Sequence, residues 1–480
     1  KSMKRDNKKR MPIVRFAPSP TGALHLGGAR VALFNYLYAK KFGGKFLIRI
    51  EDTDKQRSKK EFENQIIASL TWLNLKWDSK IFTQSKNKKL HSDTIASLLE
   101  TKKAYKCFCS HEEIEKLRKT TNSYRYPNIW RERSDSDIKD EEQRGTPFSV
   151  RLKTPQSGET TFKDHVYGDI SVKNSEIDDF ILARSDENQT PVYNLVVVVD
   201  DHSMAITHVI RGEDHISNTI KQILIYKALN WEIPEFVHLP MILGSNKERL
   251  SKRHGATGVQ EYQKEGYQHE GLLNYLAFLG WNPGTDEEIM NLDALAKSFS
   301  FEGIQKKGAI FDIKKLNWFS SKHLSIQPSD SIIENIIKID KKWALGYEKT
   351  YKLKVVDLLK ERSHSLIDLI DKGAYFFSNN IIYDLNLKNK FWDENSFQIL
   401  NEYKNVICKL KKWEIINIEE ISKDFMANMN LGFAKVMKPV RFIISGVLSG
   451  PPIFDIIYLI GKDNFKKRID RALKEFKNES

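Results

Sequence analysis

Two short stretches, far apart in this sequence, combine residue types that handle phosphate groups. The first is "HLGG" at residues 25–28, in a Pro- and Gly-rich loop that leads into a helix. Backbone N–H groups at such a helix start bind phosphate oxygens, and Gly27 and Gly28 would let a nucleotide lie against the backbone. The imidazole of His25 can donate a hydrogen bond to a phosphate that gains charge in a transition state. The alternative is a plain tight turn with a surface histidine.

The second stretch is "ERLSKRHGA" at 248–256, which places Arg249, Lys252 and Arg253 around a serine in a loop. Such a basic loop is suited to holding the β- and γ-phosphates of ATP while pyrophosphate leaves. Taken alone, each stretch is explained better by ordinary surface structure. The pair, in this order, indicates a nucleotide site.

The elements around "HLGG" predict a sheet that would position these residues. A strand is predicted over 13–16, an amphipathic helix over 29–41, and a second strand in "GGKFLIRIED". This strand–helix–strand order is typical of a parallel sheet, whose ligands bind at the carboxyl ends of the strands. Three acidic residues follow the second strand at such an end: Glu51, Asp52 and Asp54.

Further along, the texture of the chain changes twice. Residues 94–193 mix charged stretches with short alternating segments such as "FSVRLK", which predicts a mixed insertion into the sheet domain. The sheet pattern resumes with "NLVVVVDDH" at 194–202, predicted to be a buried strand. From about residue 250 the apolar periodicity is helical. The predicted fold class is an α/β Rossmann-type domain with a mixed α/β insertion, followed by an all-α C-terminal region.

Composition excludes several classes of protein. The net charge of +14 fits a polyanionic partner such as nucleic acid, and equally a solvated lysine-rich surface. Three cysteines are too few for a disulfide framework, so we expect a reducing, cytoplasmic compartment. The basic residues 1–10 contain no apolar block, so we expect no secretory signal, although an organelle transit remnant stays open. No apolar run approaches a membrane span, and no membrane partner is expected.

Six motifs in one order make the sequence similar to bacterial-type glutamyl-tRNA synthetases, a class I family. They are "RFAPSPTGALHLGGAR", "RIEDTD", "VVVDDH", "HVIRGEDH", "LSKRHGA" and "LLNYLAFLGW". The class signatures "HIGH" and "KMSKS" appear here as "HLGG" and "RLSKR", so Gly28 and Arg249 depart from the class pattern. The resemblance implies a monomeric glutamate–tRNA ligase. Its substrates would be L-glutamate, tRNA(Glu) and ATP, with Mg²⁺ accompanying ATP.

Glutamate itself dictates part of the expected site, because it carries two carboxylates and one ammonium group. Arg15 and Arg211 can each hold a carboxylate through two parallel hydrogen bonds, and Glu51 can pair with the ammonium. Ser19 and Tyr193 add neutral hydrogen bonds. The resemblance places these same five residues at the glutamate contacts of the family.

The resemblance also implies the nucleotide contacts. They fall on Ala17, His25, Gly27, Gly28, Asp214 and Lys252. Among these, His25 and Lys252 are the expected catalytic residues. The implied reaction is an in-line attack of the α-carboxylate of glutamate on the α-phosphate of ATP, followed by transfer to the terminal adenosine of the tRNA. Positioning and charge stabilisation carry such chemistry without a protein nucleophile.

The family organisation implies four domains. They are a split catalytic domain (11–93 and 194–245), an insertion that binds the acceptor end (94–193), a helical stem-contact domain with the RLSKR loop (246–326), and an all-helical anticodon-binding domain (327–480). In the last, Arg362 matches an arginine that reads an anticodon base, although a solvated helix arginine would look the same.

Some members of the family bind zinc in the insertion through a Cys-x-Cys pair and a later Cys-x-His pair. Here Cys107 and Cys109 form the first pair, but Trp130 and Glu132 stand where the later ligands would come. Two thiolates do not complete a tetrahedral site, even with His111 as a further candidate. We expect no bound metal in the insertion.

Three alternatives remain open. A closely related synthetase could charge tRNA(Gln), alone or together with tRNA(Glu), for later amidation. A paralogue that attaches glutamate to a modified tRNA base would lack the anticodon-binding third, which this chain carries. A non-catalytic tRNA-binding relic of the fold would be expected to lose its phosphate-handling residues, yet His25 and Lys252 are both present.

Overall fold

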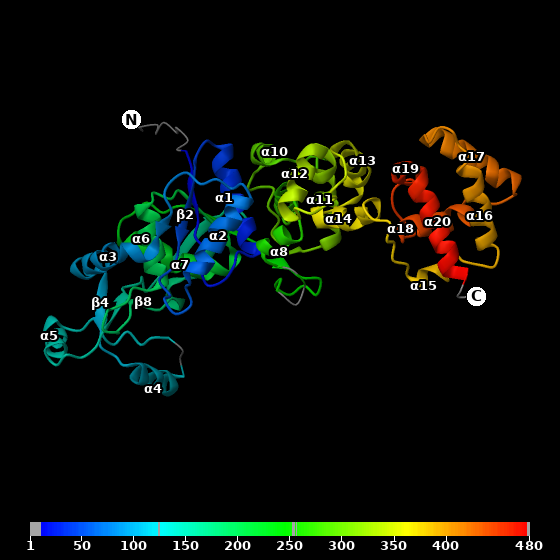
Figure 1. The fold of residues 1–480 in the computed structure, drawn as a ribbon. Coiled ribbons are helices and arrows are strands. Elements are labelled where there is room, and N and C mark those ends of the chain that lie inside the picture. Colours follow the sequence, from blue (N-terminus) through cyan, green and yellow to red (C-terminus); the bar gives the residue numbers. More distant parts are fainter. Residues whose placement is uncertain (1–10, 123–124, 252–254, 256, 478–480) are drawn as a thin grey trace, which may run out of the picture. The chain divides into compact units, whose positions relative to one another are not determined.

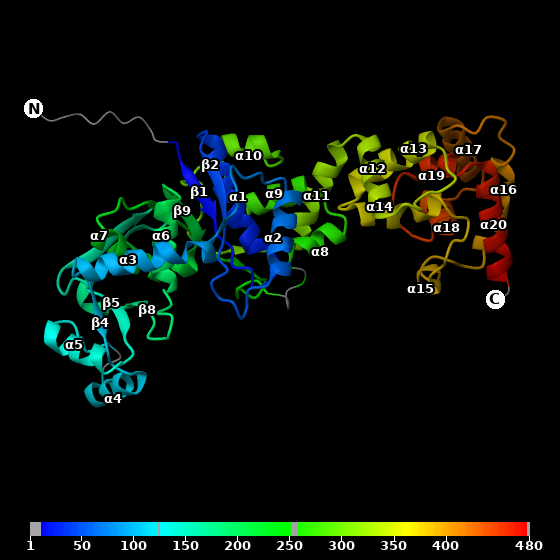
Figure 2. The same cartoon turned by 60° about the vertical axis from the view of Figure 1, so that its left-hand side comes forward.

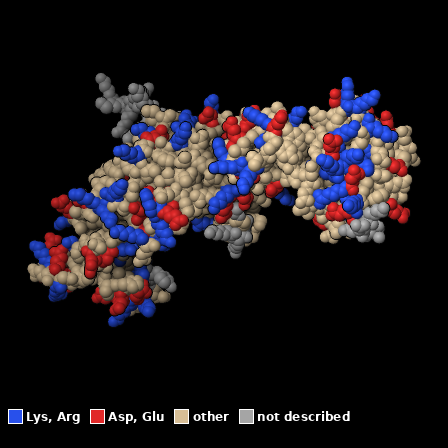
Figure 3. All heavy atoms as spheres, viewed as in Figure 1, with Lys and Arg blue, Asp and Glu red and all other residues tan. Residues whose placement is uncertain are grey.

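The structure is a computed structural model that describes residues 11–122, 125–251, 255 and 257–477 (Figure 1). The chain forms two compact units, and each is described by itself. One comprises 1–261 with 273–312, and the other comprises 262–272 with 313–480. Among the described residues, no helix has the length and apolar character needed to cross a membrane. On the face drawn in Figure 3, Lys and Arg side chains are intermixed with Asp and Glu side chains.

A parallel sheet forms the centre of the first unit. Strand β1 (Ile13–Phe16) pairs in parallel with β2 (Lys45–Ile50), and helix α1 (Leu26–Lys41) connects them, which confirms the predicted strand–helix–strand unit. Strand β3 (Phe82–Thr83) extends this side of the sheet. On the other side of β1 lies β9 (His208–Gly212), joined to it where the N–H of Thr207 donates to the carbonyl of Ile13 over 2.9 Å (Figure 2).

Strand β9 is the edge strand of a second sheet of four strands, two of which come from the segment predicted to be an insertion. Strand β10 (Glu235–Leu239) pairs in parallel with β9 and also with β6 (Glu159–Asp164). Strand β7 (Gly168–Lys173) completes this row as the antiparallel partner of β6. Two strands from within 94–193 therefore belong to the same sheet as β9, the strand that carries Arg211.

The rest of that segment builds a small separate layer. Its strands form one antiparallel sheet: β4 (Ala104–Cys107), β5 (Ser149–Leu152) and β8 (Ile181–Ala183). Helices α4 (His111–Thr121) and α5 (Asp135–Gln143) each begin with a serine capping box. The layer is mixed α/β, as predicted.

The predicted strand "NLVVVVDDH" is wrong, because these residues lie in helix α6 (Tyr193–Ser203). Residues 195–199 are all buried, since α6 packs within the core against α3 (Lys88–Glu100) and α7 (Ile216–Ala228). A helix buried on every side shows no apolar periodicity, so a short run of valines fits a buried strand equally well. Tertiary packing then overrides the strand preference of valine.

The remaining elements complete both units. In the first unit these are α2 (Lys60–Trp72), α10 (Leu292–Ser298) and the short parallel pair β11 (Ile242–Leu243) and β12 (Ala309–Ile310). Helices α8 (Val259–Lys264) and α9 (His269–Phe278) include residues of both units.

The described part of the second unit from residue 313 onward contains helices and no strand, as the sequence predicted. The α-helices are α11 (Ile313–Ile326), α12 (Ser329–Ile339), α13 (Lys349–Leu359), α14 (Leu366–Gly373), α15 (Leu385–Lys388), α16 (Ser396–Ile407), α17 (Ile415–Asn428), α18 (Phe433–Ser445), α19 (Ile453–Ile460) and α20 (Lys462–Lys477). Their buried faces form one aliphatic and aromatic core that includes Ile332, Tyr403 and Phe465.

Candidate active site

A cavity of about 730 Å³ opens at the carboxyl ends of β1, β2 and β9. The expected glutamate and nucleotide contacts that the structure describes all line it: Arg15, Ala17, Ser19, His25, Gly27, Gly28, Glu51, Tyr193, Arg211 and Asp214. Lys252 lies outside the described residues, although Arg249 and Ser251 of the same loop line the cavity. Arg362 lies in the second unit.

One end of the cavity is a buried network of arginines and carboxylates. Arg15 on β1 donates to Asp201 through Nε (2.8 Å) and Nη2 (3.2 Å). Arg49 on β2 donates to the same carboxylate through Nη1 (2.6 Å) and to Glu51 through Nη2 (3.0 Å). All four side chains are at least nine-tenths buried. The geometry differs from the expected free two-pronged grip of Arg15, because Asp201 already occupies that fork.

The two carboxylates of this network respond differently to burial. Burial opposes ionisation of Asp201, but Arg15 and Arg49 outweigh it and lower the pKa of Asp201 to about 2. Burial raises the pKa of Glu51, and the nearby Arg49 and Arg15 only partly offset that effect. Asp201 is thus the fixed negative charge of the network. Glu51 uses Oε1 for both of its contacts with Arg49, so Oε2 has no hydrogen bond among the described residues.

Sequence reasoning missed Asp201 and Arg49 as parts of this site. Both stood inside quoted motifs, "VVVDDH" and "RIEDTD", but nothing local distinguishes Asp201 from its neighbour Asp200. The helix separates the two, because Asp200 instead accepts from His91 (2.8 Å) and Gln84 (3.0 Å). Only the position of α6 beside β1 assigns Asp201 to the arginines.

Arg211, near the end of β9, is hydrogen-bonded through Nε and Nη2, whereas its Nη1 is not. Its Nη2 donates to Thr219 and to Gln222, each over 2.8 Å, and its Nε approaches Nε2 of His238 at 3.3 Å. Its Nη1 is buried and has no hydrogen-bond partner among the described residues. A buried guanidinium nitrogen without a partner is costly, and a ligand carboxylate would satisfy it.

The other end of the cavity is built where the two phosphate-handling stretches meet. The N–H of Leu26 donates to the carbonyl of Thr257 (2.8 Å), and the N–H of Val259 donates to that of Leu24 (2.9 Å). These bonds join the start of α1 to the chain immediately after "RLSKRHGA". The structure therefore brings together two stretches that the sequence separates widely.

His25 caps helix α1 in a way that defines its protons. Its Nδ1 accepts from the N–H of Gly28 over 3.3 Å, so the neutral ring carries its proton on Nε2. Burial and the nearby Arg249 lower the pKa of His25, which keeps the ring neutral at pH 7. The imidazole can therefore donate a hydrogen bond through Nε2, and a phosphate contact of His25 stays a prediction.

The two glycines of this motif are needed for packing as well as for access. A Cβ on Gly28 would lie 2.9 Å from Cδ1 of Leu24, and a Cβ on Gly27 would lie 3.2 Å from Nδ1 of His25. A side chain at either position would therefore displace the wall of the cavity or the capping histidine. Across the cavity, the carboxylate of Asp214 folds over Gly212, where a Cβ would approach within 2.4 Å.

Comparison with known proteins places these features in a family. Residues 13–318 match the family model described as tRNA synthetases class I (E and Q), catalytic domain, and residues 333–473 match an anticodon binding domain. The chain is 40% identical over 481 residues to glutamate–tRNA ligase 2 of Caldicellulosiruptor saccharolyticus, a match that covers 97% of this chain and 99% of the relative. This chain belongs to the glutamate–tRNA ligase family.

Further members of the family agree with the sequence-based resemblance. The glutamate–tRNA ligase of Lawsonia intracellularis is 41% identical over 467 residues, covering 96% of this chain and 98% of that protein. The crystal structure of a glutamate tRNA ligase from Elizabethkingia meningosepticum in complex with its amino acid matches with a TM-score of 0.86 at 31% identity. That match covers 97% of this chain and 99% of the other. Family and fold class were therefore predicted correctly.

The insertion of this ligase-family chain shows no metal site in its described part. Sγ of Cys107 lies 3.1 Å from the hydroxyl of Tyr126, and the side chain of Trp130 packs against Phe108. No group of three or more His, Cys, Asp or Glu side chains suited to a metal occurs among the residues that the structure describes. That the protein binds no zinc stays a prediction.

Arg362, the expected anticodon contact, lies in a short 3₁₀ turn (Lys360–Arg362) that follows α13. It is exposed, and its carbonyl accepts a hydrogen bond from Nζ of Lys372. The positive charge of Arg362 contributes a lowering effect to the pKa of both Tyr375 and Arg441. The hydroxyl of Tyr375 and Nη1 of Arg441 are buried without hydrogen-bond partners among the described residues. Base reading by Arg362 stays a prediction.

Proposed function

We propose that this chain is a glutamate–tRNA ligase, which uses ATP to join L-glutamate to the terminal adenosine of tRNA(Glu). The observation that carries the proposal is the single cavity at which buried arginines meet both phosphate-handling stretches. Glutamate brings carboxylates for the arginines, and ATP brings phosphates for the helix start and the basic loop. The curated relatives carry this activity in their names, and one solved relative holds its amino acid.

The amino-acid end of the cavity would hold glutamate through nitrogen and oxygen atoms that have no hydrogen bond to the described part of the protein. Arg15 and Arg211 offer their Nη1 groups to carboxylates, since their other nitrogens are engaged. Glu51 offers Oε2 to the ammonium group, and Ser19 and Tyr193 add neutral hydrogen bonds. Because the network is paired internally before the ligand arrives, little rearrangement is needed on binding.

The nucleotide end would hold ATP against Ala17, Gly27 and Gly28, with Asp214 on the facing wall. The α-carboxylate of glutamate attacks the α-phosphorus, the bond to the bridging oxygen breaks, and pyrophosphate leaves. The proton on Nε2 of His25 stabilises charge that develops on the phosphates, and Lys252 neutralises the departing pyrophosphate. Mg²⁺ bound with ATP would supply further charge neutralisation at the phosphates.

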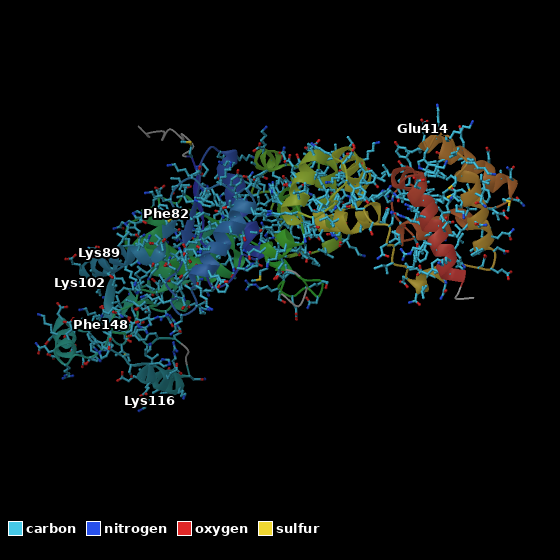
Figure 4. The ribbon with its side chains drawn as sticks, viewed as in Figure 1. Phe82, Lys89, Lys102, Lys116, Phe148 and Glu414 are labelled. Carbon is cyan, nitrogen blue, oxygen red and sulfur yellow. The ribbon has the colours of Figure 1, made fainter. Side chains whose placement is uncertain are left out.

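Transfer RNA would contact both units. The insertion offers exposed lysines to a phosphate backbone, among them Lys102 and Lys116, with Lys89 on neighbouring α3 (Figure 4). We propose the domain bounds given above, with the acceptor end at 94–193, the stem at 246–326 and the anticodon at 327–480. The all-α second unit argues against the paralogue that lacks it. We propose that the active form is a monomer.

Aminoacylation with [14C]-glutamate tests the proposal, using purified tRNA(Glu) and tRNA(Gln) in separate reactions. Charging of tRNA(Glu) alone is the expected result. Charging of both would mean that the anticodon-binding part accepts both and that an amidating enzyme works downstream. Charging of neither, by folded protein, would contradict the ligase and leave the tRNA-binding relic. ATP–pyrophosphate exchange in the presence of tRNA separates a failure of activation from a failure of transfer.

A further inference from the structure

A chain of buried polar groups extends from Arg211 away from the cavity. Nδ1 of His238 on β10 lies 2.7 Å from Oδ2 of Asp164, and its Nε2 lies 3.3 Å from Nε of Arg211 and 3.0 Å from Oγ1 of Thr219. Asp164 and His238 are 1% and 0% exposed. Asp164 is the last residue of β6, in the segment predicted to be an insertion, and it pairs in register with Phe236 of β10.

The hydrogen bonds of Asp164 define where the ring proton lies. Oδ1 of Asp164 accepts from the N–H groups of Val166 and Tyr167, and Oδ2 accepts from the N–H of His238 (3.1 Å). Burial would raise the pKa of Asp164, but the bonds from His238, Tyr167 and Val166 outweigh it, so the carboxyl is ionised. An ionised carboxylate only accepts hydrogen bonds, so Nδ1 of His238 must carry the proton.

The same reasoning makes Nε2 of His238 an acceptor. Burial lowers the pKa of His238, and although Asp164 opposes this effect, the positive Arg211 reinforces it, so the ring is neutral. With the proton on Nδ1, the lone pair on Nε2 faces both the Nε–H of Arg211 and the hydroxyl of Thr219. Phe236, two residues earlier on β10, places its ring 5.9 Å from the guanidinium carbon. The guanidinium is thus fixed in rotation as well as in position.

We propose that Asp164 and His238 are positioning residues, which orient Arg211 so that its free Nη1 meets a carboxylate of glutamate. The inference rests on the proposed function, because it assigns a carboxylate ligand to Arg211. Without the acceptor on His238, the Nε side of the guanidinium is released and Arg211 can turn. The expected consequence is weaker glutamate binding, with little effect on ATP.

Two substitutions of His238 test the hydrogen bonds of its two ring nitrogens separately. His238→Asn keeps a donor where Nδ1 was, so the bond to Asp164 survives while the acceptor for Arg211 is lost. His238→Gln keeps an acceptor where Nε2 was and loses the bond to Asp164. We expect His238→Asn to raise the KM for glutamate about 10-fold or more, the range for a lost hydrogen bond to a charged group. His238→Gln should restore most of that loss, and the KM for ATP should change less than about 3-fold in both variants.

The measurements are the KM values for glutamate and ATP in aminoacylation by the full chain, together with calorimetric titration of glutamate. Failure of the unsubstituted protein to charge tRNA would contradict the proposed function. An active unsubstituted protein, with an unchanged glutamate KM in His238→Asn, would overturn this inference alone. Equal effects of His238→Asn and His238→Gln on both substrates would also overturn it, because a packing role predicts that result.

A third variant covers the case in which the His238 variants do not fold. Asp164→Asn can keep Oδ1 on the N–H groups of Val166 and Tyr167, which turns its amide toward Nδ1 of His238 and removes the bond that Oδ2 accepts from the backbone N–H of His238. The ring proton then moves to Nε2, where it opposes the N–H of Arg211. A raised glutamate KM in folded Asp164→Asn protein supports the inference, and an unchanged one contradicts it.

Discussion

The two ends of the cavity differ in whether their charged groups are buried and paired within the protein. At the amino-acid end, charged side chains from β1, β2, α6 and β9 are buried, and nearly every polar atom is paired within the protein. At the nucleotide end, the groups are backbone N–H donors, a capping histidine and an exposed basic loop that includes Arg249. The ion pairs of the amino-acid end are therefore formed before any ligand binds. The groups of the nucleotide end would find their ionic partners in the phosphates of the substrate.

The difference has a physical origin. A buried charge must have partners in the folded protein, since an unpaired one costs several kcal/mol. An exposed cation is solvated and costs little, so it can remain free for a phosphate. Substitutions at the amino-acid end should therefore lower stability and glutamate binding together. Substitutions in the exposed basic loop of the nucleotide end should lower the rate and leave stability unchanged.

The largest expected effect is that of Asp201→Asn. It removes the charge that pairs with Arg15 and Arg49, so two buried guanidinium groups lose their shared partner. The free energy of unfolding of the first unit should fall by about 3–5 kcal/mol, measured by urea denaturation, and glutamate binding should weaken. Asp54→Asn is the matched control, because Asp54 pairs with Arg57 at the surface, and it should leave the midpoint unchanged. Equal stability of both variants would remove the distinction between the two ends.

Lys252→Ala should produce the next largest effect, and on the rate alone. Loss of one charge that stabilises the transition state costs about 10²–10³-fold, or about 3–4 kcal/mol in the barrier. The measurement is ATP–pyrophosphate exchange with tRNA present, alongside thermal unfolding. Lys247→Ala, an exposed lysine in the same loop that does not line the cavity, serves as the control. A near-normal rate for Lys252→Ala would show that the loop does not clamp the phosphates.

Acid should act on the amino-acid end in a defined pH window. The folded-state pKa of Asp201, about 2, is below its ordinary value of 3.8. The stability that this carboxylate contributes is therefore complete above about pH 4 and is lost as the pH falls through about 2. The contribution corresponds to about 2 kcal/mol. The measurement is the free energy of unfolding of the unsubstituted protein and of Asp201→Asn between pH 5 and pH 2. The difference between the two proteins should shrink by about 2 kcal/mol as the pH falls. Parallel curves would contradict the assigned role of Asp201.

The smallest expected effect lies outside the cavity. Arg362→Ala should raise the KM for tRNA(Glu) about 10-fold, at the lower end of the range for an arginine that reads a base. The KM values for glutamate and ATP should not change. Lys338→Ala, another exposed basic residue of the second unit, provides the comparison for a general loss of charge. If both variants weaken tRNA equally, Arg362 contributes only charge.

Sequence reasoning was strongest where local pattern and chemistry coincide. The strand–helix–strand unit, the helical C-terminal region and the cavity-lining residues from Arg15 to Asp214 were all expected from short motifs. It failed at 194–202, where residues 195–199 are buried on every side and leave no periodicity to distinguish helix from strand. Within 94–193, no local pattern showed that β6 and β7 pair in one sheet with β10 and β9, whereas β4, β5 and β8 form a sheet of their own.

The sequence by itself indicated which residue types meet the substrates: a histidine followed by two glycines, a basic loop, and two arginines suited to carboxylates. Only the tertiary structure decided which charges are paired. Asp201 lies 186 residues from Arg15 in the chain, and Asp164 lies 74 residues from His238. Contacts at such separations leave no local pattern, because they depend on how the strands and helix α6 are packed. That packing determines which arginine nitrogens remain free for a ligand.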